Sequence, residues 1–376
     1  MGGSIQLVKI FGIPLRIHWT FFLLFGGLAF FGWSQTGSFS YLLWSSLFLL
    51  SVFACVALHE FGHALTARRY GVKTVDIILS PIGGIARLDK LPEKPWQEFS
   101  VAIAGPLVNI GIALLLAPFL FLIDRENTDT FLNLLWNGNL PRLPVLLSSY
   151  FAASLFILNL SLAFFNLIPA FPMDGGRIFR ALLSMPLGRL RATQIASVVG
   201  QVFAVLMVLY GLWTYSIILA FIGVFIFFSA AQEYRFMQTE SLLSKETVKR
   251  LMRRNFTLLT ASDLLQKPLD LYLQGAERNF LVAGDTDEVP IGILPEIALM
   301  DALKMEQVIG IVEDYIIPIH PAPISKDMNL REAYDLMQQS NRETLVIGDD
   351  AGQIIGILEM YQIHFYLQLQ QRLKKS

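Results

Sequence analysis

The chain has 376 residues, of which 54% are hydrophobic and only 16% are charged, and its mean hydropathy is +0.53. Such a composition excludes an ordinary soluble protein and predicts an integral membrane protein. A formal net charge of −1 gives no basic footprint for nucleic acid, and the single cysteine, Cys55, excludes an internal disulfide and a cysteine-based zinc site.

Six apolar stretches reach the roughly 20 residues that a helix needs to cross the bilayer core. We predict spans at about 17–33, 41–67, 97–123, 143–168, 193–212 and 215–232, the first a retained helix and the last two a tight hairpin. Lysines and arginines gather before the first span, between the second and third, and between the fourth and fifth. The positive-inside rule therefore predicts a multi-pass protein of the cell membrane with both termini in the cytoplasm.

A metal-binding pattern, His59-Glu60-Phe61-Gly62-His63, lies near the cytoplasmic end of the second predicted span. On a helix, two histidines four residues apart share a face, so both imidazoles can reach one Zn²⁺. Glu60 is then placed to take a proton from the attacking water, as in a metallohydrolase. The alternative is a polar helix end that emerges at the lipid headgroups, although ionisable residues at membrane depth are functional by default.

The connection that follows, Gly71 to Pro95, has a β-rich pattern in which Val75, Ile77 and Leu79 alternate with other residues. An exposed strand there could pair with an unwound substrate and present its peptide bond in extended form. A simple amphipathic connector explains the same residues.

Catalytic zinc takes three protein ligands and leaves one position open, so a third ligand is required. The other histidines, His18, His320 and His364, are not convincing, because the first begins the first span and the others lie in the C-terminal part of the chain. The segment 166–177 ends the fourth span with two prolines and two glycines at the cytoplasmic depth of the histidines. Asp174 in this segment can complete the site; the alternative is a cytoplasmic turn with a capping aspartate.

Two amides, Asn109 and Asn159, lie within apolar spans, where an asparagine side chain ordinarily hydrogen-bonds between helices. We expect that structural role for both, and we expect Cys55 to be a buried structural thiol.

The composition changes after Arg235, and the rest of the chain is ordinary soluble α/β sequence. Three short pieces of 280–294, Leu-Val, Gly-Asp and Gly-Ile-Leu, recur 64 positions later in 344–358. Each copy is typical of a helix, a β-pair with a turn, and another helix, a unit that needs its twin to bury a core. We predict a membrane domain at 1–235 and a cytoplasmic tail at 241–376, with repeats at about 245–300 and 308–372.

The membrane part resembles the site-2 protease family of intramembrane metalloproteases. The resemblance rests on the histidine pattern, on Ala104-Gly105-Pro106-Leu107-Val108-Asn109, and on Asn166 through Arg177 with Met173-Asp174-Gly175-Gly176. It implies that His59, His63 and Asp174 bind zinc, that Glu60 is the general base, and that Asn166 contacts the substrate carbonyl or the developing oxyanion. An amide near zinc can act as such a donor, but Asn166 could equally tie the fourth span to its neighbours.

The tail resembles a pair of CBS domains, which often bind adenine nucleotides or build dimers. After Gly-Ile-Leu the family often has a Thr or Ser, with an Asp three residues on, to hold the ribose; here the positions are Pro295 and Ala298, then Glu359 and Gln362. We therefore expect ATP and AMP to bind weakly or not at all, and we favour a homodimer through the tail.

Together these features predict a polytopic α-helical membrane protein with six transmembrane helices, a small membrane-associated β-rich segment and a soluble α/β CBS-domain pair. The predicted function is that of an intramembrane zinc endopeptidase that cuts a single-span membrane protein, within or near its transmembrane helix, in a lipid bilayer, under control of the tail. One alternative is a transporter or channel regulated by CBS domains, in which His59, His63 and Asp174 line an ion path. Another is an inactive relative that binds without cutting.

Overall fold

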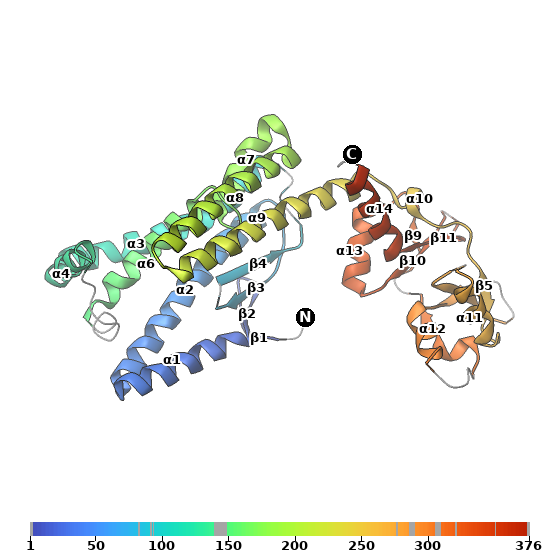
Figure 1. Ribbon diagram of the computed structural model, residues 1–376, viewed down its shortest axis with the longest axis horizontal. Coiled ribbons are helices and arrows are strands. Elements are labelled where there is room, and N and C mark those ends of the chain that lie inside the picture. Colours follow the sequence, from blue (N-terminus) through green and yellow to red (C-terminus); the bar gives the residue numbers. More distant parts are fainter. Residues whose placement is uncertain are drawn as a thin grey trace. The chain divides into compact units, whose positions relative to one another are not determined.

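The protein is described by a computed structural model of its 376 residues. The structure describes residues 3–81, 83–90, 92, 94–138, 149–275, 277–285, 290–304, 310–319, 322–349 and 351–373. The chain divides into two compact units, Met1–Arg235 and Phe236–Ser376 (Figure 1).

A four-stranded sheet opens the first unit, in the order β1 (Ser4–Ile10), β2 (Ile13–His18), β3 (Thr74–Ser80) and β4 (Gly83–Leu88). β2 pairs with β3 in parallel, and the other two pairings are antiparallel. The sheet confirms the β-rich pattern expected after the second span. The expected start of the first span at 17 is wrong, because residues up to His18 belong to β2 and the helix begins at Thr20.

One face of this sheet packs on the helix that carries the histidine pattern. Alternate residues of β2 are buried together with side chains of β3 and of α2 (Phe39–Arg69), among them Ile17, Ile77, Phe61 and Ala64. On β3 the buried Asp76 also pairs with Arg16 of β2 and Arg87 of β4. Such cross-strand pairs fix the register and hold the edge strand β4 beside the second half of α2.

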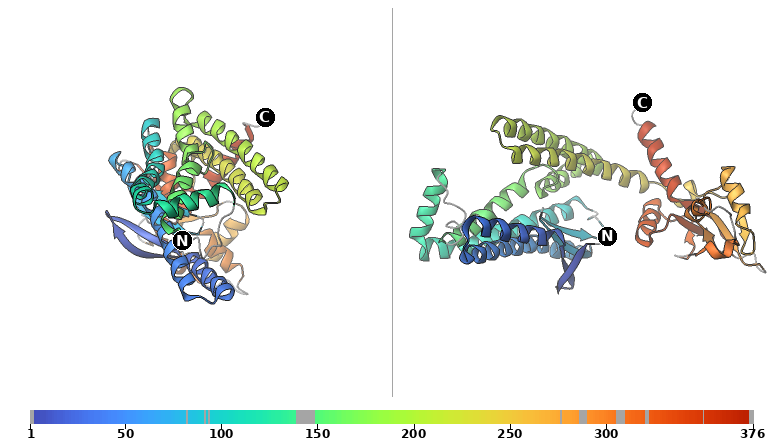
Figure 2. Two further views of the ribbon diagram at one scale, coloured as in Figure 1. Left: turned by 90° about the vertical axis from the view of Figure 1, so that its left-hand side faces the viewer. Right: turned by 60° about the horizontal axis from the view of Figure 1, so that its bottom comes forward.

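Helices make up the rest of the first unit (Figures 1 and 2). They are α1 (Thr20–Thr36), α2, α3 (Pro95–Pro118) with a π-helical extension (Phe119–Ile123), α4 (Arg125–Trp136), α6 (Phe151–Leu167), α7 (Asp174–Leu187), α8 (Arg189–Trp213) and α9 (Ile217–Leu243). The Ser38 hydroxyl accepts a hydrogen bond from the Tyr41 N–H and caps α2. Both figures show α8 and α9 side by side, as expected of the predicted hairpin.

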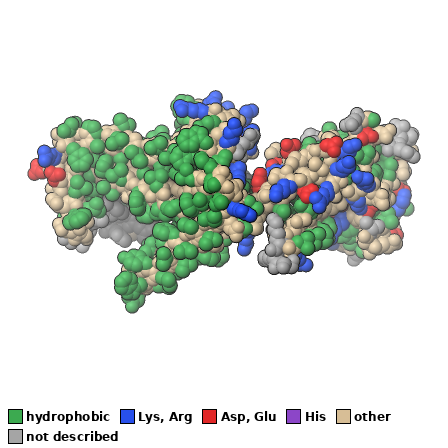
Figure 3. Space-filling view, turned by 90° about the horizontal axis from the view of Figure 1, so that it is seen from above, with side chains coloured by type: hydrophobic (Ala, Val, Ile, Leu, Met, Phe, Trp, Pro, Cys, Tyr) green, Lys and Arg blue, Asp and Glu red, His purple; other side chains and the backbone are tan. Residues whose placement is uncertain are grey.

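Four helical segments are long and apolar enough to cross a membrane, among the residues that the structure describes: Phe39–Arg69, Pro95–Ile123, Arg189–Trp213 and Ile217–Leu243. Two more apolar helices, Thr20–Phe30 and Phe151–Leu167, are shorter. The start of the span expected at 143–168 lies outside the described residues. Figure 3 shows hydrophobic side chains spread over the outer face of this unit, as a lipid-facing surface requires.

Two helices of the first unit were not expected from the sequence. α4 lies between the third and fourth predicted spans, where we predicted no helix. α7 begins at Asp174, within the segment expected to be an irregular turn. The prolines that suggested the turn, Pro169 and Pro172, both precede α7 and so do not interrupt it. An aspartate in the first turn also suits the positive end of a helix.

The second unit contains the two sequence repeats, each built as strand, helix, two antiparallel strands and helix. The first has β5 (Leu258–Thr260), α11 (Gln266–Leu273), β6 (Phe280–Ala283), β7 (Pro290–Leu294) and α12 (Glu296–Ala302), with β8 (Ile317–Pro318) added at the edge of its sheet. The second has β9 (Ile324–Ser325), α13 (Leu330–Ser340), β10 (Thr344–Gly348), β11 (Ile354–Glu359) and α14 (Met360–Leu373). Leu281 and Ile293 share a buried cluster with Val346 and Ile357, so the twin repeats bury a core together.

Candidate active site

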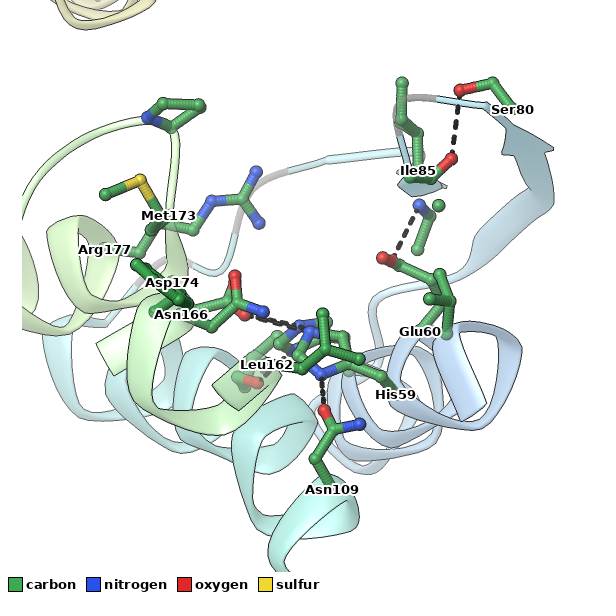
Figure 4. Close-up of a pocket in the computed structure, with 18 of the residues that line it drawn as sticks. His59, Glu60, Ser80, Ile85, Asn109, Leu162, Asn166, Met173, Asp174 and Arg177 are labelled. Atoms are coloured by element: carbon green, nitrogen blue, oxygen red, sulfur yellow. Dashed lines mark hydrogen bonds and ion pairs between the residues drawn. The ribbon is translucent and has the colours of Figure 1, made fainter. Parts of the chain in front are cut away.

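The three predicted metal ligands meet at one point. His59 and His63 lie one turn apart on α2, and their Nε2 atoms are 3.1 Å from each other. Oδ2 of Asp174, at the first position of α7, is 3.1 Å from each of these nitrogens (Figure 4). All three side chains are buried, with 7%, 5% and 7% of their residue surface exposed. Among the described residues, this is the one cluster of three or more such side chains with the geometry to hold a metal ion.

The spacing of the three donor atoms suits zinc. Tetrahedral Zn²⁺ with ligand bonds of 2.0–2.1 Å has neighbouring donors about 3.3 Å apart. The observed triangle, 3.1 Å on each side, is close to one face of that tetrahedron. Two imidazoles and one carboxylate are also a donor set typical of catalytic zinc, with a fourth position left for water.

Hydrogen bonds fix the orientation of both imidazoles. His59 Nδ1 donates to Oδ1 of Asn109, 2.5 Å away, and His63 Nδ1 donates to the carbonyl oxygen of Val101 at 2.7 Å. Because both partners are oxygen acceptors, each Nδ1 carries the hydrogen and each Nε2 presents its lone pair to the metal position. Asn109 and Val101 both belong to α3, which therefore orients the two imidazoles of α2.

The amide of Asn109 is itself held by a second amide. Its Nδ2 donates to Oδ1 of Asn159 at 2.9 Å, and Asn159 donates to the carbonyl of Leu155 at 2.8 Å and to the buried Cys55 thiol. The interhelical role expected for these asparagines is confirmed, as is the buried position of Cys55. The sequence did not predict that Asn109 also accepts a hydrogen bond from His59; the available signal was a lone amide in an apolar span.

α3 passes the histidines so closely that one position cannot carry a side chain. A Cβ atom placed on Gly105 would lie 2.3 Å from His63 Nε2 and 2.6 Å from His59 Nε2. Glycine at this position therefore leaves room for both imidazoles and for a metal ion that they could hold.

Glu60 faces the same cavity as the ligands but is held by the sheet. Its Oε2 accepts a hydrogen bond from the N–H of Ala86 on β4, at 3.1 Å. A Cβ on Gly84, also on β4, would lie 2.6 Å from Glu60 Cγ. The edge strand thus sets where the Glu60 carboxylate lies (Figure 4).

The cavity has a volume of about 590 Å³ and is bordered by α2, β4, α6 and α7. Asn166, at the end of α6, lines it, as does Arg177, one turn after Asp174 (Figure 4). From the sequence, no role in the site was expected for Arg177. Of the histidines set aside as ligands, His18 bonds to Thr20 at the end of β2, His364 lies on α14, and His320 is outside the described residues.

Comparison with known proteins agrees with this geometry. Residues 47–210 match the sequence model of Peptidase family M50, and a zinc metalloprotease of Methanocaldococcus jannaschii is 35% identical over 376 residues, which is 100% of each chain. The chain belongs to peptidase family M50, the site-2 proteases. A zinc metalloprotease homologue of Synechocystis is 28% identical over 98% of this chain and 96% of its own length.

Two further matches concern separate parts of this site-2 protease. Residues 312–368 match the CBS domain, within the second unit. The solved structure of a site-2 protease from Methanocaldococcus jannaschii is 38% identical, covers 61% of this chain and 95% of its own, and has a TM-score of 0.42.

Proposed function

We propose that this protein is an intramembrane zinc endopeptidase that hydrolyses a peptide bond within or near the transmembrane helix of a single-span membrane protein. The observation that carries the proposal is the triangle of donor atoms, 3.1 Å on each side, formed by His59, His63 and Asp174 beside the Glu60 carboxylate. His59, Glu60 and His63 of this constellation lie on α2, a helix that is apolar enough to span a membrane, and Asp174 comes from the start of α7.

Each residue of the site has a separate task in this proposal. His59, His63 and Asp174 hold zinc, which supplies Lewis-acid activation of a water molecule and of the peptide carbonyl. Glu60 accepts the proton of the attacking water and passes it to the leaving amine. Asn166, which lines the same cavity, donates a hydrogen bond to the developing oxyanion.

A membrane-spanning substrate must unwind before it can be cut, because a helix shields its peptide bonds in internal hydrogen bonds. The β4 strand supports a way to hold the unwound segment. β4 ends the sheet order and lines the cavity through Gly83, Gly84, Ile85 and Ala86. An extended substrate can pair with this edge and bring its peptide bond to the metal.

Six spans are proposed, with both termini in the cytoplasm and the first unit as the membrane domain 1–235. The four long helices account for four spans, and the shorter apolar helices around Thr20–Phe30 and Phe151–Leu167 account for the others. A 17-residue helix such as α6 is about 25 Å long, somewhat short of the 30 Å hydrocarbon core. The distribution of Lys and Arg along the sequence supports the orientation.

The CBS tail, proposed at 241–376, is assigned a regulatory or dimerising role without catalytic groups. Two of its positions that would contact a nucleotide ribose are engaged internally. Glu359 accepts a hydrogen bond from Asn279 at 2.7 Å and lies 3.6 Å from Arg253. Oε1 of Gln362 accepts a hydrogen bond from the backbone N–H of Glu359 at 3.0 Å. These contacts support weak or absent adenine-nucleotide binding.

The test is Glu60→Gln in the full chain, purified in detergent and assayed on a single-span substrate with parallel metal analysis. An amide of nearly the same shape cannot accept the proton, so cleavage should be lost while one zinc per chain remains. Glu126→Gln on α4, an exposed position, is the matched control and should cut at the wild-type rate. Wild-type turnover by Glu60→Gln would contradict the assignment of the base. Metal-dependent ion flux without cleavage would favour the channel alternative.

A further inference from the structure

Arg180 is a buried cation close to the candidate metal site but outside its cavity. It lies on α7 with 1% of its surface exposed. Its guanidinium donates to Glu98 of α3, with Nε 2.6 Å and Nη2 2.5 Å from the same carboxylate oxygen, and it also pairs with Glu233 of α9. Burial lowers the pKa of the Arg180 guanidinium, but the two carboxylates outweigh burial and raise its pKa above the usual arginine value. The side chain is therefore a permanent charge that ties three helices together.

A buried ion pair of this kind adds little net stability, because desolvation offsets most of the attraction. Replacement by apolar side chains is often neutral or stabilising. Such a network is therefore better explained by the relative placement of helices that it imposes. Here it fixes α7, which begins at Asp174, against α3, which contacts both histidines.

On α7, Arg180 is linked to the segment that carries the third ligand. Asp174 begins the same helix, and the Arg180 guanidinium lies 5.1 Å from the centre of the Phe171 ring, three residues before Asp174. The cation therefore contacts both the helix and the chain that enters it. Any shift of Arg180 relative to α3 moves Asp174 with it.

On α3, the partner of Arg180 is linked to the histidines. Glu98 lies one turn before Val101, whose carbonyl receives the hydrogen bond of His63. Residues three apart share a helix face, so the ion pair and the histidine contact are neighbours on α3.

We propose that Arg180 is a positioning residue, which fixes the separation between Asp174 and the histidine pair by clamping α7 to α3 through Glu98. The inference rests on the proposed zinc site. Zinc–ligand distances vary by only about 0.2 Å in a well-formed site, so even a small displacement of α7 against α3 would spoil a ligand position. The planar guanidinium supplies two directed hydrogen bonds to one carboxylate and a third to another, which the ammonium of lysine cannot reproduce in the same plane.

The first measurement is the rate at which a chromophoric chelator removes zinc from the full-length Arg180→Lys variant. We expect release about 10-fold faster than from the wild type, the low end of the range for loss of a direct hydrogen-bond partner of a metal ligand, because Arg180 acts on the ligands only through α3 and α7; kcat should fall and KM stay nearly unchanged. Arg191→Lys on α8, an exposed position, is the control and should release zinc as the wild type does.

A second pair of variants separates positioning from general stability. Glu98→Gln weakens the link to α3, whereas Glu233→Gln weakens only the link to α9. Faster zinc release in Glu98→Gln, with near-wild-type release in Glu233→Gln, supports the clamp. Equal release from both, or wild-type release from Arg180→Lys and Glu98→Gln, overturns it while leaving the zinc site intact. A wild-type chain that binds no zinc overturns both the clamp and the proposed function.

Discussion

A methyl group at Gly105 should abolish metal binding without damaging the helix that carries it. In Gly105→Ala the new Cβ would lie 2.3 Å from His63 Nε2, 2.5 Å from His63 Cε1 and 2.6 Å from His59 Nε2. Ordinary van der Waals contact begins near 3.4 Å, so the rings or α3 must move by about 1 Å.

The size of the effect follows from the tolerance of the metal site. Zinc–ligand distances vary by only about 0.2 Å, so a displacement of about 1 Å removes at least one good ligand position. Loss of an outer hydrogen-bond partner alone weakens metal binding by about 10–100-fold. Because Gly105→Ala displaces the ligands themselves, we expect zinc affinity to fall by at least about 100-fold and cleavage to fall with it.

The matched control is Gly111→Ala on the same helix, where nothing lies within 4 Å of a new Cβ. Alanine is better than glycine in a helix interior by about 1 kcal/mol, so this variant should be at least as stable as the wild type. Zinc affinity is measured by chelator competition on both full-length variants, and cleavage on a single-span substrate. Wild-type zinc affinity in Gly105→Ala would refute the reasoning.

Three further outcomes are expected. Gly84→Ala should lower kcat and keep zinc, since the new Cβ would lie 2.6 Å from Glu60 Cγ and its three nearest neighbours all belong to Glu60; zinc loss in a metal assay would contradict this. A substrate span with one glycine near the cut should be cleaved about fivefold faster than a matched alanine span, because glycine weakens a helix by about 1 kcal/mol. Equal rates in a gel assay would show that unwinding does not limit cleavage. Calorimetric titration of the full chain with ATP or AMP should show no micromolar binding, given the internal partners of Glu359; a micromolar dissociation constant would contradict a purely dimerising tail.

The grouping of His59, His63 and Asp174 could be predicted because it follows from helical spacing and from the number of ligands that a catalytic metal takes. Helical spacing places His59 and His63 on one face, and a catalytic metal would then require a third donor, for which Asp174 is placed. The repeats of the tail could also be predicted, because the two copies share residues at a fixed spacing in the sequence.

What the sequence did not reveal depends on contacts between distant segments. The β1–β2 hairpin was hidden because β2 completes its sheet only with β3, about 60 residues later, and its apolar residues merged with the first span. The same holds for Arg180. The sequence places it in a predicted cytoplasmic connection, and its partners Glu98 and Glu233 belong to helices far away in the sequence. A glycine within a helix, such as Gly105, gives no local signal of what passes beside it.

The arrangement of α3 connects these separate observations. Glu98, Val101, Gly105 and Asn109 follow one another at intervals of three or four residues, so they form one stripe along the helix. Along this stripe α3 pairs with Arg180 of α7, accepts a hydrogen bond from His63, leaves room at Gly105 for both imidazole rings, and accepts a hydrogen bond from His59. A slip of α3 by one residue would turn the stripe by about 100° and break all four contacts together. Glu98 and Asn109 in a mostly apolar helix are therefore explained by one requirement: α3 holds His59 and His63 of α2 and Asp174 of α7 at a common point.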